Sequence, residues 1–263
     1  MKQVIGLVLL GLLCSNGVLA ENGSNTQAEA PSQSGRIING AEVNIAGYKF
    51  AISLFVDNRY YCGASIITAS HALTAAHCVL GIAPSRVILY GGSSFLNRPV
   101  VRITVSRIAV HPSYNPSVSK NYDAAVITVP TNSFVGKPNM APIGLQTAQV
   151  PTGTRCYVVG WGWYDNNLQT ASNSLRYTNV QTVSDASCSA TFQQTIMPDQ
   201  ICSINGNNIE VCKGDSGSAL VCGGTVTGVV SFGRVPCTNA APTVYAKVMG
   251  PSVRSFIRSQ AGI

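Results

Sequence analysis

The sequence predicts an all-β fold that ends in a single helix, and three of its features lead to this prediction. Short runs rich in Val, Ile, Tyr and Thr recur along the chain, and these residues favour strands. Gly, Pro, Asn and Ser separate the runs, as they do at turns. Helical spacing of apolar residues is clear only near the end, where Val253, Phe256 and Ile257 follow Pro251.

The expected strands form one uninterrupted series. In order they are Ala51 to Val56, Gly63 to Thr68, Arg86 to Tyr90, Val100 to Val105, Ala124 to Val129, Cys156 to Gly160, Ser218 to Cys222, Thr225 to Val230 and Thr243 to Val248. Gly223-Gly224, between two of these runs, predicts a tight hairpin. No repeat of fixed period and no low-complexity block divides the series, so we expect one folding unit.

The composition excludes two classes of protein. Of the 263 residues, 46% are hydrophobic and 10% are charged, which excludes disorder as the main theme. The formal net charge is +7, but the basic residues lie singly and do not alternate with aromatic residues. We therefore expect no nucleic-acid partner.

The first 20 residues have the pattern of a secretory signal. An apolar run from Val4 to Leu13 follows a basic residue, and Ala20 supplies a small residue at the expected cut. The alternative is a membrane anchor, but ten apolar residues are too few to cross a bilayer. We expect a secreted, extracellular protein with no membrane partner.

Residues 21–36 are polar and end at Arg36, directly before the apolar Ile37. An exposed Arg between a polar segment and a folded domain is a site where proteolytic cutting is expected. The sequence therefore divides into a signal over 1–20, an activation segment over 21–36 and a single domain over 37–263.

Export determines how the cysteines are interpreted. Cys14 lies in the signal, which leaves an even number: Cys62, Cys78, Cys156, Cys188, Cys202, Cys212, Cys222 and Cys237. In an oxidising compartment this predicts four disulfides, with the pairing open. Zinc binding is the rival use, but no Cys-x-x-Cys pair occurs and the histidines are scattered. We expect neither a metal nor any other cofactor.

Three segments contain the residue types that acyl-transfer chemistry needs: a nucleophile, a base, an acid that orients the base, and backbone donors for the oxyanion. Ser216 lies in the glycine-flanked loop Gly214-Asp215-Ser216-Gly217. His77 follows a strand among small residues, and Asp123 opens an apolar strand. Taken singly, each segment has another explanation: a surface turn for Ser216, a structural histidine for His77 and a strand-end cap or turn residue for Asp123.

Taken together, the segments resemble the chymotrypsin-trypsin family of serine proteases along the whole of residues 37–263. The resemblance rests on Arg36-Ile37-Ile38-Asn39-Gly40, Cys62-Gly63-Ala64-Ser65, Leu73-Thr74-Ala75-Ala76-His77-Cys78, Asp123, Gly160-Trp161-Gly162, Gly214-Asp215-Ser216-Gly217, Ser231-Phe232-Gly233 and Val244-Tyr245-Ala246. The order His, Asp, Ser distinguishes this family from other triad enzymes. It implies two six-stranded antiparallel β-barrels with the triad in the cleft between them.

The resemblance also implies a role for each site residue. Ser216 would attack the scissile carbonyl, His77 would accept and return the proton, and Asp123 would orient His77. The N–H groups of Gly214 and Ser216 would form the oxyanion hole. Residues implied to pair with an extended substrate are Ser231, which would also support Asp123, together with Phe232 and Gly233.

Family membership would give the cysteines and the activation site specific partners. The implied disulfides are Cys62–Cys78, Cys156–Cys222, Cys188–Cys202 and Cys212–Cys237. Cutting after Arg36 would free the ammonium of Ile37 to pair with Asp215 and order the oxyanion loop. The expected partners are protein or peptide substrates, an activating protease and protein inhibitors, and we expect a monomer.

The chain departs from the family around the substrate pocket. Ser218 stands where most members have glycine, and a positive φ there would cost about 1 kcal/mol. Glu210, at the pocket base, is either a receptor for basic side chains or a plug hydrogen-bonded to Thr243, which narrows one wall. Gly233 leaves the opposite wall open. Lys213 and Arg234 are at the pocket mouth. These two cations are either solvated or favour acidic residues in neighbouring substrate positions.

The sequence as a whole predicts a secreted serine endopeptidase made as a zymogen. The rival prediction is a catalytically weak or inactive homologue that acts as a binding or regulatory protein. Such homologues normally lack a triad residue, and here all three are present.

Overall fold

A computed structural model describes residues 40–164, 170–205, 211–234, 237 and 241–263, which all belong to one compact unit of the chain. The expected signal, the activation segment with Arg36, the new terminus Ile37 and the pocket residue Glu210 lie outside the described residues.

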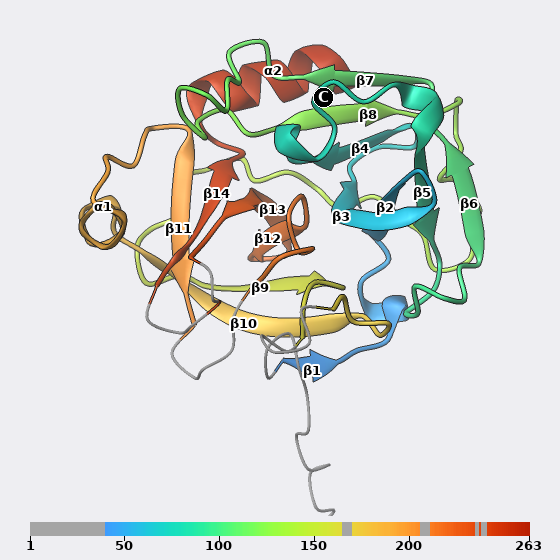
Figure 1. The fold of residues 1–263 in the computed structure, drawn as a ribbon, viewed down its shortest axis with the longest axis horizontal. Coiled ribbons are helices and arrows are strands. Elements are labelled where there is room, and N and C mark those ends of the chain that lie inside the picture. Colours follow the sequence, from blue (N-terminus) through green and yellow to red (C-terminus); the bar gives the residue numbers. More distant parts are fainter. Residues whose placement is uncertain (1–39, 165–169, 206–210, 235–236, 238–240) are drawn as a thin grey trace, which may run out of the picture. The chain divides into compact units, whose positions relative to one another are not determined.

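The elements are nearly all strands (Figure 1). In chain order they are β1 (Ala41–Glu42), η1 (Ile45–Gly47), β2 (Ala51–Val56), β3 (Arg59–Ile66), β4 (His71–Thr74), η2 (Ala76–Cys78), η3 (Pro84–Arg86), β5 (Val87–Gly91), β6 (Val101–Thr104), β7 (Arg107–Val110), β8 (Ala125–Thr128), β9 (Arg155–Gly160), β10 (Arg176–Val183), α1 (Asp185–Phe192), β11 (Gln200–Ile204), β12 (Ala219–Cys222), β13 (Thr225–Phe232), β14 (Thr243–Lys247) and α2 (Pro251–Ala261). The three η elements are single 3₁₀ turns. Within the described ranges, no helix is long and apolar enough to cross a membrane.

The strands form two antiparallel sheets, which confirms the predicted all-β fold of two barrels. One sheet has the order β6-β5-β2-β3-β4-β8-β7, and the other has the order β1-β10-β11-β14-β13-β12-β9. In the second sheet β9 also pairs with β10, so the six strands from β9 to β14 form a closed ring.

Each sheet contains seven strands where six are predicted, and the extra strand has a local cause in each. In the second sheet, β1 is a two-residue strand that pairs with β10 outside the closed ring. In the first sheet, only Val105 and Ser106 separate β6 from β7, so one run is divided into two strands.

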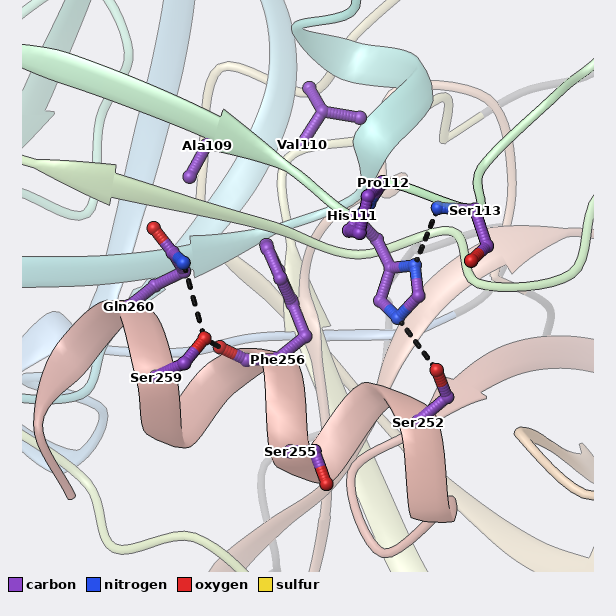
Figure 2. Close-up of a pocket in the computed structure, with 10 residues that line it drawn as sticks. All are labelled: Ala109, Val110, His111, Pro112, Ser113, Ser252, Ser255, Phe256, Ser259 and Gln260. Carbon is purple, nitrogen blue, oxygen red and sulfur yellow. Dashed lines mark hydrogen bonds between the residues drawn. The ribbon is translucent and has the colours of Figure 1, made fainter.

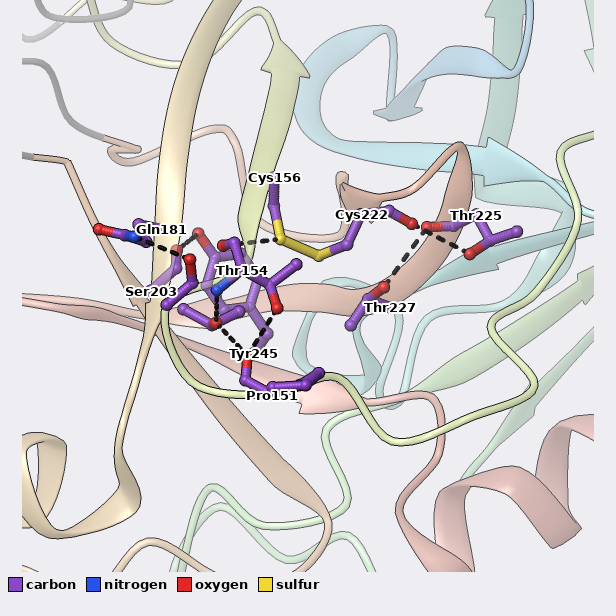
Figure 3. The surroundings of a disulfide bond; sticks show 11 residues. Pro151, Thr154, Cys156, Gln181, Ser203, Cys222, Thr225, Thr227 and Tyr245 are labelled. Atoms are coloured by element: carbon purple, nitrogen blue, oxygen red, sulfur yellow. Dashed lines mark hydrogen bonds between the residues drawn. A yellow bond between two sulfur atoms is a disulfide. The ribbon is translucent and has the colours of Figure 1, made fainter.

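Aliphatic side chains fill the interior of both barrels. Fully buried examples in the first sheet are Ile52, Leu54, Ile66, Leu73 and Ile127, and in the second sheet they are Val158, Val226 and Leu220. The Cys156–Cys222 disulfide joins β9 to β12, and the hydroxyls of Tyr245 and Ser203 lie 2.8 Å apart nearby (Figure 3). The disulfide therefore joins two strands of the barrel whose interior is also stabilised by buried aliphatic side chains.

The C-terminal helix α2 confirms the helical pattern. Its apolar face buries Val253, Phe256 and Ile257. The side chain of Asp199 caps its first turn, because Oδ1 accepts the N–H groups of Ser252 and Val253 at 2.9 Å each.

Helix α1 is not predicted from the sequence. Of its eight residues only Cys188 is buried, so it has no apolar stripe. The helix is held instead by the Ser184 Oγ, which accepts the Ser187 N–H, and by the disulfide from Cys188 to Cys202 on β11.

Candidate active site

The strand register brings His77 and Asp123 to the same end of one strand pair. In the β4–β8 pairing, Thr74 lies opposite Ala125. His77 follows the end of β4 by three residues, and Asp123 precedes the start of β8 by two. Since paired strands share an edge, the two side chains must emerge side by side.

The imidazole and the carboxylate form a direct hydrogen bond. His77 Nδ1 lies 2.7 Å from Asp123 Oδ2, and the His77 backbone N–H donates to Asp123 Oδ1 at 2.9 Å. The Asp123 side chain is 1% exposed, and Ser231 Oγ donates to its Oδ2 at 2.5 Å. These contacts fix the Nδ1–H tautomer and leave Nε2 of the partly exposed ring for proton transfer.

Tyr114 is a further neighbour of this carboxylate. Burial, and secondarily the negative charge of Asp123, raise the pKa of the Tyr114 hydroxyl. The environment of Asp123 is therefore poor in water, and its hydrogen bonds from His77 and Ser231 take the place of hydration.

Contacts to both neighbouring elements hold the Ser216 loop beside His77. The Ser216 carbonyl accepts the N–H of Gly63, the residue after Cys62, and Cys62 is disulfide-bonded to Cys78 next to His77. A Cβ on Gly217 would lie 2.3 Å from Thr74 Oγ1, so the loop packs directly on the segment that leads to His77. The Gly217 N–H donates to the carbonyl of Val230, the residue before Ser231.

Two backbone donors in this loop have no acceptor in the part of the chain that the structure describes. Among the described residues, none accepts the N–H of Gly214 or of Ser216. Gly214 has a φ of +90° and Gly217 a φ of +83°, conformations that glycine adopts without strain. The loop can therefore offer two N–H groups to a developing oxyanion.

Asp215 is completely buried and held by backbone donors. Its Oδ1 accepts the Gly162 N–H at 2.9 Å and its Oδ2 accepts the Cys212 N–H at 3.0 Å. Burial raises the pKa of Asp215 to about 6, against the lowering effect of these two hydrogen bonds. Glycine is required at Gly160 and Gly162, where a Cβ would overlap the carboxylate.

Ser218 does not carry the backbone strain that a positive φ would bring. The described non-glycine residues with positive φ are Asp57, Asn58, Tyr122, Asn132, Asn139 and Gln193. The side chain of Ser218 instead occupies the space left by a glycine, because a Cβ on Gly63 would lie 2.1 Å from Ser218 Oγ.

The residues expected to form the substrate pocket are placed in part. Thr243 is buried at the start of β14, and a Cβ on Gly233 would lie 3.9 Å from Thr243 Oγ1. A single methyl group on Gly233 would therefore already be in van der Waals contact with Thr243. Glu210, the expected base, lies outside the described residues.

The two expected cations at the pocket mouth contact different aromatic rings. The Lys213 ammonium lies 4.8 Å from the centre of the Trp163 ring. The Arg234 guanidinium lies 6.0 Å from the centre of the Phe192 ring and donates to the Thr191 carbonyl. Lys213 and Arg234 are therefore held by separate anchors.

The four disulfides join the same cysteines that the resemblance pairs: Cys62–Cys78, Cys156–Cys222, Cys188–Cys202 and Cys212–Cys237. In the described part of the chain, one group of three ligand-type residues has donor atoms within 4.8 Å of one another, namely Cys62, His77 and Cys78. Both sulfurs of this group are in a disulfide, so they offer no thiolate to a metal.

A pocket of about 570 Å³ between β7 and α2 is lined by none of His77, Asp123 and Ser216 (Figure 2). The buried His111 on its wall donates from Nε2 to Ser252 Oγ, while its Nδ1 accepts the Ser113 N–H. Burial lowers the pKa of His111, which keeps the ring neutral. This histidine joins α2 to the first barrel and has a structural role.

Serine hydrolases use this arrangement, in which a buried carboxylate orients a histidine beside a glycine-flanked serine. The comparisons with known proteins agree. Residues 37–257 match the family model Trypsin. Trypsin beta of Drosophila erecta is 31% identical over 253 residues, which cover 95% of this chain and 98% of the relative. Trypsin alpha of Drosophila melanogaster is 32% identical, with 95% and 97% covered.

A solved structure is also similar. The structure of neuropsin, a serine protease expressed in the limbic system of mouse brain, aligns with a TM-score of 0.75 and 26% identity, over 84% of this chain and 98% of neuropsin. The chain belongs to the trypsin family and is a serine endopeptidase.

Proposed function

We propose that the protein is a secreted serine endopeptidase made as a zymogen, in which His77, Asp123 and Ser216 form the catalytic triad. The observation that carries the proposal is the chain of hydrogen bonds from Ser231 through Asp123 to His77, with the Ser216 loop packed against the segment that precedes His77.

The geometry supports an acyl-enzyme mechanism. Ser216 Oγ attacks the scissile carbonyl while His77 Nε2 takes its proton, and Asp123 stabilises the imidazolium. The N–H groups of Gly214 and Ser216 stabilise the oxyanion. The imidazolium then protonates the leaving amine. In the second half of the reaction His77 Nε2 takes a proton from the water that attacks the acyl-enzyme and returns it to Ser216 Oγ, which leaves as the acid product is released.

Activation by cleavage after Arg36 is the second part of the proposal. Asp215 is buried with two neutral donors and with no cation paired to it among the described residues, and its raised pKa reflects the cost of burying this carboxylate. The ammonium of Ile37, once freed by an activating protease, would supply that cation. Pairing would then hold the oxyanion loop that contains Gly214 in its ordered arrangement.

Export and the remaining partners follow from the sequence and the family. A signal over 1–20 and four disulfides suit an oxidising, extracellular compartment. The substrates are proteins or peptides whose extended backbone pairs along Ser231, Phe232 and Gly233, and protein inhibitors would occupy the same strand edge. We propose that the enzyme acts as a monomer.

The primary specificity depends on Glu210 and Thr243. The closeness of Thr243 to the opposite wall favours small or apolar side chains over long basic ones. On this proposal Glu210 would act as a plug and not as a receptor for basic side chains.

Cleavage-site mapping tests these proposals. Protein cut after Arg36 is incubated with a mixed peptide library, and the products are identified by mass spectrometry, with Ser216→Ala as the matched control. Cuts after small or apolar residues are expected. Cuts after Lys or Arg would make Glu210 a cation receptor, and no cuts above the control would favour the binding or regulatory homologue.

A further inference from the structure

Two cations and two aromatic rings form a continuous strip beside the catalytic carboxylate. The Lys120 ammonium lies 4.8 Å from the centre of the Phe232 ring, and the Phe232 and Phe192 rings meet edge to face with centres 5.5 Å apart. The Arg234 guanidinium lies over Phe192. We call the four residues Lys120, Phe232, Phe192 and Arg234 the cation–aromatic strip.

Two residues of the strip are close in sequence to residues of the candidate active site. Lys120 precedes Asp123 by three residues, and Phe232 follows Ser231, whose hydroxyl donates to Asp123. A substrate paired along Ser231 to Gly233 would therefore pass Phe232, and with it the strip, close to the scissile bond.

The charges of the strip are available to a ligand. Lys120 and Arg234 are both exposed, and neither forms an ion pair with a carboxylate within the described ranges. A ring face attracts a cation without neutralising it, so the ammonium of Lys120 keeps N–H donors for an anion. The rings are already packed on each other and on the cations, which leaves charge as the feature presented outward.

We propose that the cation–aromatic strip binds an acidic side chain of the substrate, with Lys120 as its main determinant. This inference rests on the proposed function and names part of its substrate class. Pre-positioning by Phe232 reduces the rotamer freedom that an exposed lysine loses when it forms an ion pair.

Matched peptides that carry Glu or its neutral isostere Gln at each position near the scissile bond test the proposal. The readout is the ratio of kcat/KM for the Glu peptide to that for the Gln peptide, because a general loss of catalysis cancels in it. At one or more positions we expect a ratio of about 2 to 5 at low salt, the range of an exposed ion pair.

The variants separate this inference from the function on which it rests. Lys120→Ala should bring the ratio close to one, Lys120→Glu should bring it below one, and Lys137→Ala, which removes another exposed lysine, should leave it unchanged. High salt should also bring the wild-type ratio toward one. An unchanged ratio in Lys120→Ala overturns the inference while the peptidase activity stands. No turnover of any peptide by the cut wild type overturns the proposed function itself.

A second, independent observation concerns the peptide that contains the Gly214 N–H. The carbonyl of this Lys213–Gly214 peptide accepts the Trp163 N–H at 2.7 Å. Because a trans peptide directs its N–H opposite to its carbonyl, the Gly214 N–H faces away from Trp163. In the next peptide, the Asp215 N–H donates to the Cys212 carbonyl and the Gly214 carbonyl accepts the Tyr60 hydroxyl at 2.6 Å.

Tyr60 lies directly against the glycine that it contacts. A Cβ on Gly214 would lie 3.3 Å from Tyr60 Cε1. Burial, and secondarily the charge of Asp215, raise the pKa of the Tyr60 hydroxyl well above its usual value, so this hydroxyl stays protonated and donates. Tyr60 is on β3, two residues before the disulfide-bonded Cys62.

We infer that Tyr60 is a positioning residue for the oxyanion hole. Its hydroxyl fixes the Gly214 carbonyl from one side while Trp163 fixes the preceding carbonyl from the other. Between these two anchors the orientation of the Gly214 N–H is determined, and Tyr60 itself does not touch the substrate.

Tyr60→Phe removes the hydroxyl and keeps the ring. We expect kcat to fall by about 2- to 12-fold, the range of one hydrogen bond, with KM nearly unchanged. Affinity for a peptide aldehyde, which forms a tetrahedral adduct with Ser216, should fall by the same factor. Tyr61→Phe, at a neighbouring side chain that is 51% exposed, is the control.

The parallel loss is what a merely structural role would not produce. If Tyr60→Phe lowers the melting temperature but leaves kcat and aldehyde affinity at wild-type values, the inference is wrong. It is equally wrong if KM rises while kcat stays constant, since that result places Tyr60 in substrate binding.

Discussion

Replacing Asp215 by Asn should remove a defined pH dependence of stability. In the uncut chain residue 37 has no ammonium, and burial raises the pKa of Asp215 to about 6 from 3.8. The folded state therefore binds the proton more tightly than the unfolded state, so stability falls as pH rises from about 4 to about 6. A shift of about two units corresponds to about 3 kcal/mol.

The substitution should change stability at neutral pH much less than the charge change suggests. Asn removes the buried negative charge, which stabilises the fold by up to about 3 kcal/mol at pH 7. It also replaces one acceptor with an amide N–H₂ that faces the donor at Gly162 or Cys212, and loss of a charge-assisted hydrogen bond costs about 1.5–3 kcal/mol. We expect the two effects to offset each other nearly completely.

Urea unfolding between pH 4 and pH 8 measures the difference in free energy of unfolding between the Asp215 protein and Asp215→Asn. Both proteins contain Ser216→Ala, so that neither cuts itself, and the other titrating groups cancel between them. The stability of the Asp215 protein relative to Asp215→Asn should fall by about 3 kcal/mol across pH 4 to 6. The same pH slope in both proteins would refute the assignment of a raised pKa to Asp215.

After cleavage at Arg36, a protein with active Ser216 and Asp215→Asn should be folded but nearly inactive, and wild-type turnover would contradict the proposed activation.

Three further substitutions give direct tests of packing and hydrogen bonding. Gly63→Ala should destabilise by about 1–3 kcal/mol in urea unfolding, because the new Cβ overlaps Ser218 Oγ, and Ser218→Gly in the same chain should restore most of the loss. Ser231→Ala should lower kcat several-fold, because Asp123 loses a hydrogen bond of 2.5 Å, whereas Ser231→Thr should retain activity; equal kinetics for both would count against this role. Asp199→Ala should cost about 1–2 kcal/mol by uncapping α2, and Asp199→Asn should cost less; identical melting curves would exclude the cap.

The nine strands that the sequence predicts have mostly apolar buried faces, although β1, β4, β7 and β11 are missed as well as β10. All nine expected runs coincide with strands, with β2 matching at both ends. Strand β10 is missed because its buried positions are Arg176, Thr178, Val180 and Thr182, of which three are polar. Their burial is satisfied by hydrogen bonds, such as those between Thr178 and Asn205 and between Thr182 and the Pro151 carbonyl. A polar inward face removes the alternation that reveals a strand.

In the candidate site, the sequence predicts the residues that stand in local motifs and misses the contacts between residues far apart in the chain. His77, Asp123 and Ser216 stand in local motifs, so the sequence indicates them. Tyr60 and Gly214 are 154 positions apart, and no local pattern reveals their contact. The pairing of Lys120 with Phe232 is missed for the same reason, because an exposed lysine is unremarkable until the ring beneath it is known.

The free energy stored at Asp215 limits what cleavage after Arg36 can achieve through this residue alone. Relief of about 3 kcal/mol changes an equilibrium constant by about 100-fold. Moving a loop from 1:99 to 99:1 in favour of the ordered state requires about 5.5 kcal/mol. On our proposal, the new ammonium therefore supplies about half of a complete switch. On the same proposal, the remainder would have to come from other contacts that form on activation, and an aliphatic side chain at residue 37 is suited to apolar ones.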